Sequence, residues 1–196
     1  MTAFDIVDGG SSTHRWRWMK AIFPMSVSLR VVGFAPLTAP DARILVLGSM
    51  PGVASLRQQQ YYAHPRNAFW PIAAEVCGFE VQASYEARCA ALMASRIALW
   101  DVLQACVRPG SLDASIDITS IVPNDFQAFL DNHPSIARIC FNGAKAAAMY
   151  RRHVLPTLTT RDLRYVDLPS TSPAHAAMTR QDKLRAWGYA LALPDG

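Results

Sequence analysis

The stretch RILVLGSMPG, residues 43–52, joins a continuous apolar run to a turn rich in glycine and proline. A run that is apolar at consecutive positions is typical of a strand buried on both faces of a parallel sheet. The turn, and the aromatic segment YYAHPRNAFW at residues 61–70, are not explained by packing of a strand. We therefore expect a central strand followed by a loop that carries function.

Three further short apolar runs resemble the first and predict strands of the same sheet. They lie at residues 97–100, 136–143 and 163–169. In parallel α/β sheets, ligands bind beyond the carboxyl ends of the strands. The segments that follow the four predicted strands are therefore the places to look for a site: GSMPGVAS (48–55), WDVLQACVR (100–108), FNGAKA (141–146) and LPSTSPAHAAM (168–178).

Five segments around these strands show helical periodicity or helix-end signals. Gly78 is expected to close the first helix, Asn124 to open the third, and Thr179 with Asp182 to cap the last. The segments are 69–79, 84–96, 123–134, 143–154 and 179–193. Strands and helices in alternation predict an α/β fold with a doubly wound sheet.

Composition indicates a globular protein, because 51% of the 196 residues are hydrophobic and 17% are charged. No run approaches the roughly 20 apolar residues that a membrane helix needs, so we expect no membrane partner and a cytoplasmic location. Four separated cysteines without a C-x-x-C pair, Cys77, Cys89, Cys106 and Cys140, argue against a metal site and against disulfides. The net charge of +4 is compatible with an anionic partner such as nucleic acid.

The first 28 residues show neither helical nor strand periodicity. They contain a basic and aromatic cluster, RWRWMK at residues 15–20, and internal methionines at Met19 and Met25. We interpret residues 1–28 as a tail or as the product of a start codon placed too early, and residues 29–196 as a single folded domain.

Four blocks in a fixed order carry a resemblance: GSMPG (48–52), YYAHPRNAFW (61–70), ALWDV (98–102) and LPSTSPAHA (168–176). Together they resemble the uracil-DNA glycosylase superfamily, and within it the hypoxanthine-DNA (deoxyinosine) glycosylase branch, over about residues 33–193. The resemblance implies a three-layer α/β/α sandwich around a four-stranded, mainly parallel sheet. It also implies a monomeric enzyme of base excision repair that releases a deaminated base from damaged DNA, leaves an abasic site and needs no cofactor or metal.

The resemblance assigns a role to each block. Asn67 becomes the catalytic group that holds the attacking water, because Met50 stands where many relatives carry a carboxylate or an asparagine and a thioether orients water poorly. An amide is no general base, so the reaction would be dissociative, with negative charge leaving on the base. The base-binding residues are Gly48, Ser49, Met50, Tyr62 and Asp101. The loop that grips phosphate and wedges into the vacated stack is Ser170, Thr171, Ser172, Pro173, Ala174 and His175.

Several alternatives stay open from the residues themselves. Asn67 could cap the helix that follows it, Asp101 could cap a helix after the strand, and Tyr62 could belong to the core. The preferred base could be uracil or xanthine in place of hypoxanthine. The protein could also be a non-catalytic nucleic-acid-binding module of the same fold. A third class is a small-molecule hydrolase that uses Ser49 or Ser172 with His64 or His175 and with Asp101.

Overall fold

The computed structural model describes residues 30–159, 162–175 and 177–192. Its centre is a four-stranded sheet in which every pair of neighbours is parallel, in the order β3-β2-β6-β7. The strands are β2 (Ile44–Gly48), β3 (Ile97–Asp101), β6 (Arg138–Asn142) and β7 (Arg164–Leu168). All residues of β2 and β3 are buried, which confirms the reading of the apolar runs as a parallel sheet.

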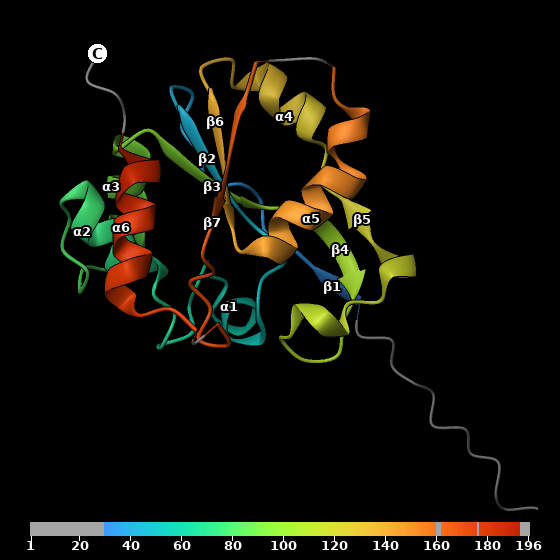
Figure 1. Ribbon diagram of the computed structural model, residues 1–196, viewed down its shortest axis with the longest axis horizontal. Helices are drawn as coiled ribbons and strands as arrows, with labels where there is room; N and C mark the ends of the chain where they lie inside the picture. Colours follow the sequence, from blue (N-terminus) through green and yellow to red (C-terminus); the bar gives the residue numbers. More distant parts are fainter. Residues whose placement is uncertain (1–29, 160–161, 176, 193–196) are drawn as a thin grey trace, which may run out of the picture.

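Helices cover both faces of this sheet, as Figure 1 shows. One face carries α2 (Phe69–Cys77), α3 (Tyr85–Ala94) and α6 (Arg180–Leu191), and the other carries α4 (Phe126–Asn132) and α5 (Ala144–His153). Because successive strand residues face opposite sides, Val46 shares a core with Trp187 of α6, whereas Leu47 shares a core with Tyr150 of α5. The expected three-layer sandwich is confirmed.

Most of the predicted helix ends agree with the structure. Gly78 ends α2 in the left-handed region, at φ 72°, and the hydroxyl of Thr179 accepts a hydrogen bond from Asp182 N at the start of α6. The start of α4 differs from the prediction, because Asp125 and not Asn124 caps this helix. The Asn124 side chain is engaged elsewhere, since its Nδ2 donates to the carbonyl of Asp101.

A second, antiparallel sheet was not predicted from the sequence. Its order is β1-β4-β5, and its strands are β1 (Arg30–Val32), β4 (Leu103–Val107) and β5 (Val122–Pro123). The segment 100–108, expected to contribute a loop, instead turns at Val102 and continues as β4. Buried Leu103, exposed Gln104 and buried Ala105 alternate as in a strand with one solvated face.

Short elements complete the described chain. They are α1 (Val53–Gln58) and three 3-10 turns, η1 (Asp113–Ser115), η2 (Ile118–Ser120) and η3 (Leu155–Thr157). The predicted tail, residues 1–28, lies outside the described residues. Among the helices of the described chain, none is long and apolar enough to cross a membrane.

The packing of α6 generates a stability prediction. Trp187 is fully buried, its ring centroid lies 5.8 Å from that of Phe69, and its Nε1 donates to the carbonyl of Pro169. Replacing Trp187 with Ala should lower the free energy of unfolding by about 3–5 kcal/mol, because it leaves a large cavity. Urea denaturation measures this change. Tyr189→Ala is the matched control on the same helix: Tyr189 is 76% exposed, and this variant should stay within about 0.5 kcal/mol. Equal losses in both variants would contradict the packing described here.

Candidate active site

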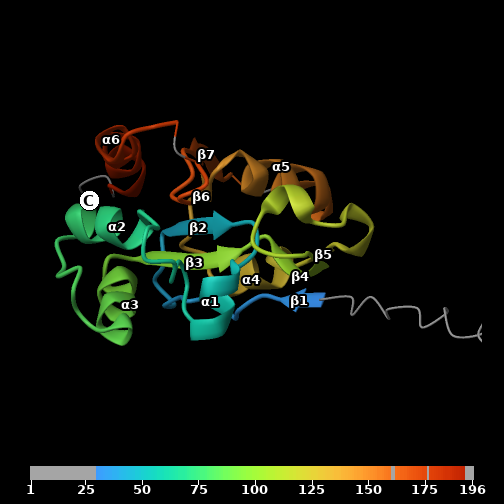
Figure 2. The ribbon, with the colours of Figure 1, turned by 90° about the horizontal axis from the view of Figure 1, so that it is seen from below.

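The carboxyl ends of the parallel strands meet at one edge, where a cleft of about 710 Å³ opens. Figure 2 looks onto this edge, with α1 between the α2 and α3 group on one side and β4 and β1 on the other. All twelve residues predicted for the site line this one cleft: Gly48, Ser49, Met50, Tyr62, Asn67, Asp101, Ser170, Thr171, Ser172, Pro173, Ala174 and His175. The four sequence blocks are thus brought together in space.

Asp101 and Gly48 form the floor of the cleft. The two residues are register partners at the ends of β3 and β2, and a Cβ atom on Gly48 would lie 2.4 Å from Asp101 Oδ1. A side chain at position 48 would therefore displace the carboxyl group. Asp101 is only 3% exposed, and its Oδ2 has no hydrogen-bond partner. Burial, and secondly the charge of Asp113, raise the pKa of Asp101 to about 7, against the opposing effect of Arg108.

Tyr62 stands beside this floor in an uncommon backbone conformation, with φ 55°. Its ring packs against Phe69 with 4.2 Å between centroids, and its side chain also lines the cleft. Its Oη is buried and forms no hydrogen bond of ordinary geometry with the described residues. Burial, followed by the charge of Asp101, raises its pKa, and the Asn142 side chain opposes that rise. Part of the Tyr62 ring therefore packs in the core, as the sequence left open, and part of it faces the cleft. Its neighbour Tyr61 is a core residue, at 5% exposed.

Asn67 performs the helix-start role that the sequence left open. Its Oδ1 accepts a hydrogen bond of 2.9 Å from Phe69 N, directly at the beginning of α2. The same oxygen retains a second lone pair, and the residue lines the cleft. Capping therefore fixes the side chain without consuming all of its hydrogen-bonding capacity.

The neighbour of Asn67 connects this segment to the last loop. Ala68 N donates to the carbonyl of Thr171, while Thr171 N and Oγ1 form two 2.8 Å hydrogen bonds with the side-chain amide of Asn142. Thr171 is 1% exposed, so the structure differs from the expected phosphate contact at this residue. Its hydroxyl and its N–H are already used inside the protein, and Asn142 emerges as the residue that holds both loops.

The loop 170–175 is held by α6 at both of its ends. Trp187 Nε1 donates to the carbonyl of Pro169, and Lys183 Nζ donates over 2.8 Å to the carbonyl of His175. Lys183 is a buried lysine, and desolvation lowers its pKa. Nothing in the sequence distinguishes it from an ordinary helical lysine. Within the loop, exposed Ala174 and His175 remain accessible at the mouth of the cleft.

A buried arginine fixes the segment at the end of β2, residues 48–55, which we call the first loop. The side chain of Arg108 is fully buried, and it donates to the carbonyls of Pro51 and Gly110. It also forms an ion pair of 3.7 Å with Asp113, whose Oδ2 accepts a hydrogen bond of 2.6 Å from Ser49 Oγ. Sequence reasoning did not identify Arg108 or Asp113, because neither belongs to a recognisable motif.

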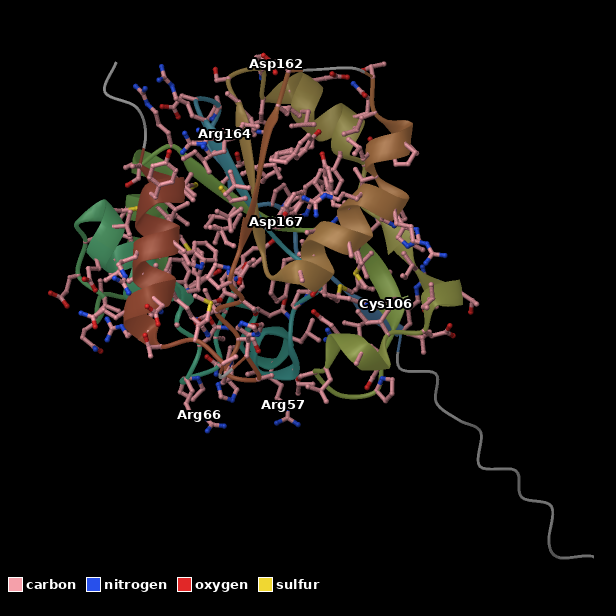
Figure 3. The ribbon with its side chains drawn as sticks, viewed as in Figure 1. Arg57, Arg66, Cys106, Asp162, Arg164 and Asp167 are labelled. Carbon is pink, nitrogen blue, oxygen red and sulfur yellow. The ribbon has the colours of Figure 1, made fainter. Side chains whose placement is uncertain are left out.

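Exposed basic side chains surround the mouth of the cleft. Arg66 and Lys145 line it, and Figure 3 shows Arg57 and Arg66 pointing away from the body at this edge, opposite Asp162 and Arg164. Within the described part of the chain, Arg57, Arg66 and Lys145 take part in no ion pair. These side chains are therefore free to attract phosphate groups. Over the same residues, no group of three or more His, Cys, Asp or Glu side chains could hold a metal ion.

Comparison with known proteins agrees with this geometry. Two proteins called Hypoxanthine DNA glycosylase are similar to the chain. The one from Methanosarcina acetivorans is 37% identical over 142 residues, which cover 68% of this chain and 89% of that protein. The one from Methanosarcina barkeri is 39% identical over 115 residues, which cover 58% of this chain and 72% of that protein.

A solved structure and a family model extend the match to most of the chain. The solution NMR structure of a uracil DNA glycosylase-like protein from Methanosarcina acetivorans superposes with a TM-score of 0.70 and 32% identity, covering 83% of this chain and 97% of that one. The family model described as the uracil DNA glycosylase superfamily matches residues 35–193. The chain therefore belongs to the uracil DNA glycosylase superfamily.

Proposed function

We propose that the chain is a monofunctional DNA glycosylase that acts as a monomer, with residues 29–196 as its catalytic domain. It hydrolyses the N-glycosidic bond of a deaminated base, hypoxanthine before uracil or xanthine, and leaves an abasic site in damaged DNA. The observation that carries the proposal is the floor of the cleft, where Asp101 Oδ2 is buried without a hydrogen-bond partner in the described part of the chain. Buried polar atoms without partners are costly, and a flipped base would supply the missing hydrogen bonds.

The mouth of the cleft suits the phosphate backbone. Excision requires the nucleotide to leave the duplex, which costs a few kcal/mol of unstacking. Arg66, Lys145 and the free polar groups of the loop 170–175 supply phosphate contacts, and Pro173 with Ala174 supplies a small apolar wedge. These contacts offset the cost of extrusion.

The floor of the cleft suits a base that carries a carbonyl group. Burial raises the pKa of Asp101 to about 7, so this carboxyl group can hold a proton at neutral pH. The protonated carboxyl group can donate to an acceptor of the base and stabilise the negative charge that departs with it. Tyr62 Oη lies on the same floor and supplies a second polar atom to the edge of the base.

Asn67 supplies the group that holds water. Its Oδ1 is fixed by Phe69 N and keeps a lone pair for a water proton. Water held in this way attacks C1′ of the sugar as the bond to the base breaks. The dissociative reaction expected from the sequence therefore remains the proposed one.

The contacts of the serines disfavour the hydrolase alternative. Ser49 Oγ donates to Asp113, and Ser172 Oγ accepts from Ala174 N. A nucleophilic serine needs a hydrogen bond to a base such as histidine, and His64 Nδ1 accepts from Arg66 N instead.

Labelled DNA containing a single altered base provides the direct test. Incubation with duplexes that carry hypoxanthine, uracil or xanthine, followed by alkali, should cleave the strand at the hypoxanthine and leave unmodified DNA intact. Binding to these duplexes without cleavage of any of them would favour the non-catalytic module. Cleavage of uracil alone would transfer the proposal to that base.

Asn67→Ala separates catalysis from capping. If Asn67 holds the attacking water, single-turnover excision should fall at least about 10²-fold while affinity for the damaged duplex is kept. Loss of the helix-start hydrogen bond alone would cost about 1 kcal/mol of stability and leave the chemical step intact. Both quantities should be measured on this variant. A lower melting temperature with near-normal excision would contradict the catalytic role.

The buried carboxyl group predicts a pH dependence of stability. The pKa of Asp101 is raised from 3.8 to about 7, so the folded protein binds this proton more tightly than the unfolded chain does. The contribution of Asp101 to the free energy of unfolding should therefore decrease as the pH rises through this range. Asp101→Asn removes the ionisation, so its stability relative to the unaltered protein should be greater at about pH 8 than at about pH 5.

Urea denaturation at both pH values measures this difference. Asp117→Asn is the control, because this carboxylate is exposed and its pKa is lowered by hydrogen bonds from Thr119. Parallel pH dependences for Asp101→Asn and the unaltered protein would show that Asp101 is ionised in the folded state throughout this range.

A further inference from the structure

The first loop lacks the group that would hold water at position 50. Met50 is 6% exposed, belongs to the hydrophobic core, and offers only a thioether. Directly beside it, however, Ser49 lines the cleft and carries a hydroxyl group. The hydrogen bonds of this hydroxyl decide what it can do.

Asp113 sets the orientation of the Ser49 hydroxyl. Ser49 Oγ donates its proton to Asp113 Oδ2 over 2.6 Å, so the lone pairs of the serine oxygen are left to accept. Asp113 is in turn fixed by Arg108, whose guanidinium lies 3.7 Å from Oδ1 and is fully buried. A hydroxyl held as a donor to a carboxylate is an acceptor towards the cleft.

The segment that carries Asp113 is itself fastened to the first loop. Ser111 Oγ accepts a hydrogen bond of 2.9 Å from Val53 N, and Arg108 donates to the carbonyl of Pro51. The carboxyl group of Asp113 thus reaches the cleft from a chain segment that lies 64 residues after Ser49.

We propose that Ser49, oriented by Asp113, holds the attacking water together with Asn67 and replaces the group that Met50 lacks. This assignment rests on the proposed glycosylase function. Ser49 is the residue that touches the water, and Asp113 is a positioning residue that acts through Ser49.

The proposed step balances in atoms and charge. The bond between C1′ and the base nitrogen breaks, and its electron pair leaves with the base. The water oxygen bonds to C1′, a water proton passes to Ser49 Oγ, and the serine proton passes to Asp113 Oδ2. The departing base takes a proton from Asp101, and exchange with solvent restores both carboxyl groups.

The surroundings of the two carboxyl groups suit these opposite roles. Asp101 is buried without a partner for Oδ2, whereas the side chain of Asp113 is 34% exposed, accepts from Ser49 and faces Arg108. Burial raises the pKa of Asp113, while Ser49, Arg108 and Lys145 oppose that rise. Two carboxyl groups in different environments are a recurrent arrangement for an acid and a base in one site.

Ser49→Ala is the direct test, with single-turnover excision of hypoxanthine as the readout. Excision should fall about 10²-fold, because the acceptor for water is lost, while binding to a duplex that carries a 2′-fluoro, non-cleavable deoxyinosine stays within about threefold. Ser49→Thr keeps the hydroxyl and should restore excision to within about fivefold of the unaltered protein. A purely structural role would lower the melting temperature of Ser49→Ala and leave excision intact.

Asp113→Asn tests the positioning role through the pH profile. In the unaltered protein, excision should rise with pH as Asp113 loses its proton. This rise should be absent in Asp113→Asn. The charged groups that face Asp113 are Arg108, Asp101 and Lys145, and burial raises the pKa of Asp101 to about 7. Loss of the Asp101 proton should lower excision at higher pH, because this proton passes to the departing base.

Asp117→Asn is the matched control, because it makes the same change in the same segment at an exposed carboxylate that does not line the cleft. Its excision and pH profile should equal those of the unaltered protein. The assignment is overturned if excision by Ser49→Ala stays within about threefold of the unaltered protein, or if excision by Asp113→Asn still rises with pH in the same way. Either result leaves the glycosylase function standing. Failure of the unaltered protein to release any of hypoxanthine, uracil and xanthine overturns the function itself and this assignment with it.

Discussion

The parallel pairing of β2 with a strand on each side is the constraint on which the site depends. Parallel strands end at the same edge, and the register sets Gly48 opposite Asp101 and Leu47 opposite Phe141, one residue before Asn142. Three chain segments that are far apart in sequence therefore deliver their polar residues to one place. A change of register by one residue would turn every side chain of a strand to the opposite face, and the polar residues would no longer meet at this edge.

Hydrogen bonds and an ion pair between buried or partly buried groups hold the loops that follow the strands at this edge. Asn142 ties the last loop to the sheet through Thr171, and Arg108 ties the first loop to the segment around Asp113. A buried donor or acceptor that loses its partner costs about 1–3 kcal/mol, so these loops have a strong preference for one conformation. Polar groups held in advance need little reorganisation when charge develops in a substrate.

The sequence predicted the parts of this molecule that local patterns determine. The four parallel strands were recognisable because their apolar runs are continuous, and the cleft because its residues lie in short blocks after those strands. The antiparallel sheet was missed because β1 and β5 have only three and two residues, and because β4 follows β3 with Val102 alone between them. The hydrogen bonds of Arg108 to Pro51 and of Ser49 to Asp113 span 57 and 64 residues, so no local pattern contains them. The burial of Arg108 therefore depends in part on a partner that is distant in the sequence.

The attachment of the loop 170–175 to α6 has a consequence for the order in which the protein becomes functional. Lys183 and Trp187 hold the two ends of this loop, and both are synthesised after every strand of the two sheets. In a chain whose strands have paired but whose α6 has not yet packed, neither of these two hydrogen bonds exists. Its cleft would then have its floor, while the loop 170–175 at its mouth would not be held in place. Competence to hold DNA is thereby delayed until the helix that closes the sandwich has been made and packed.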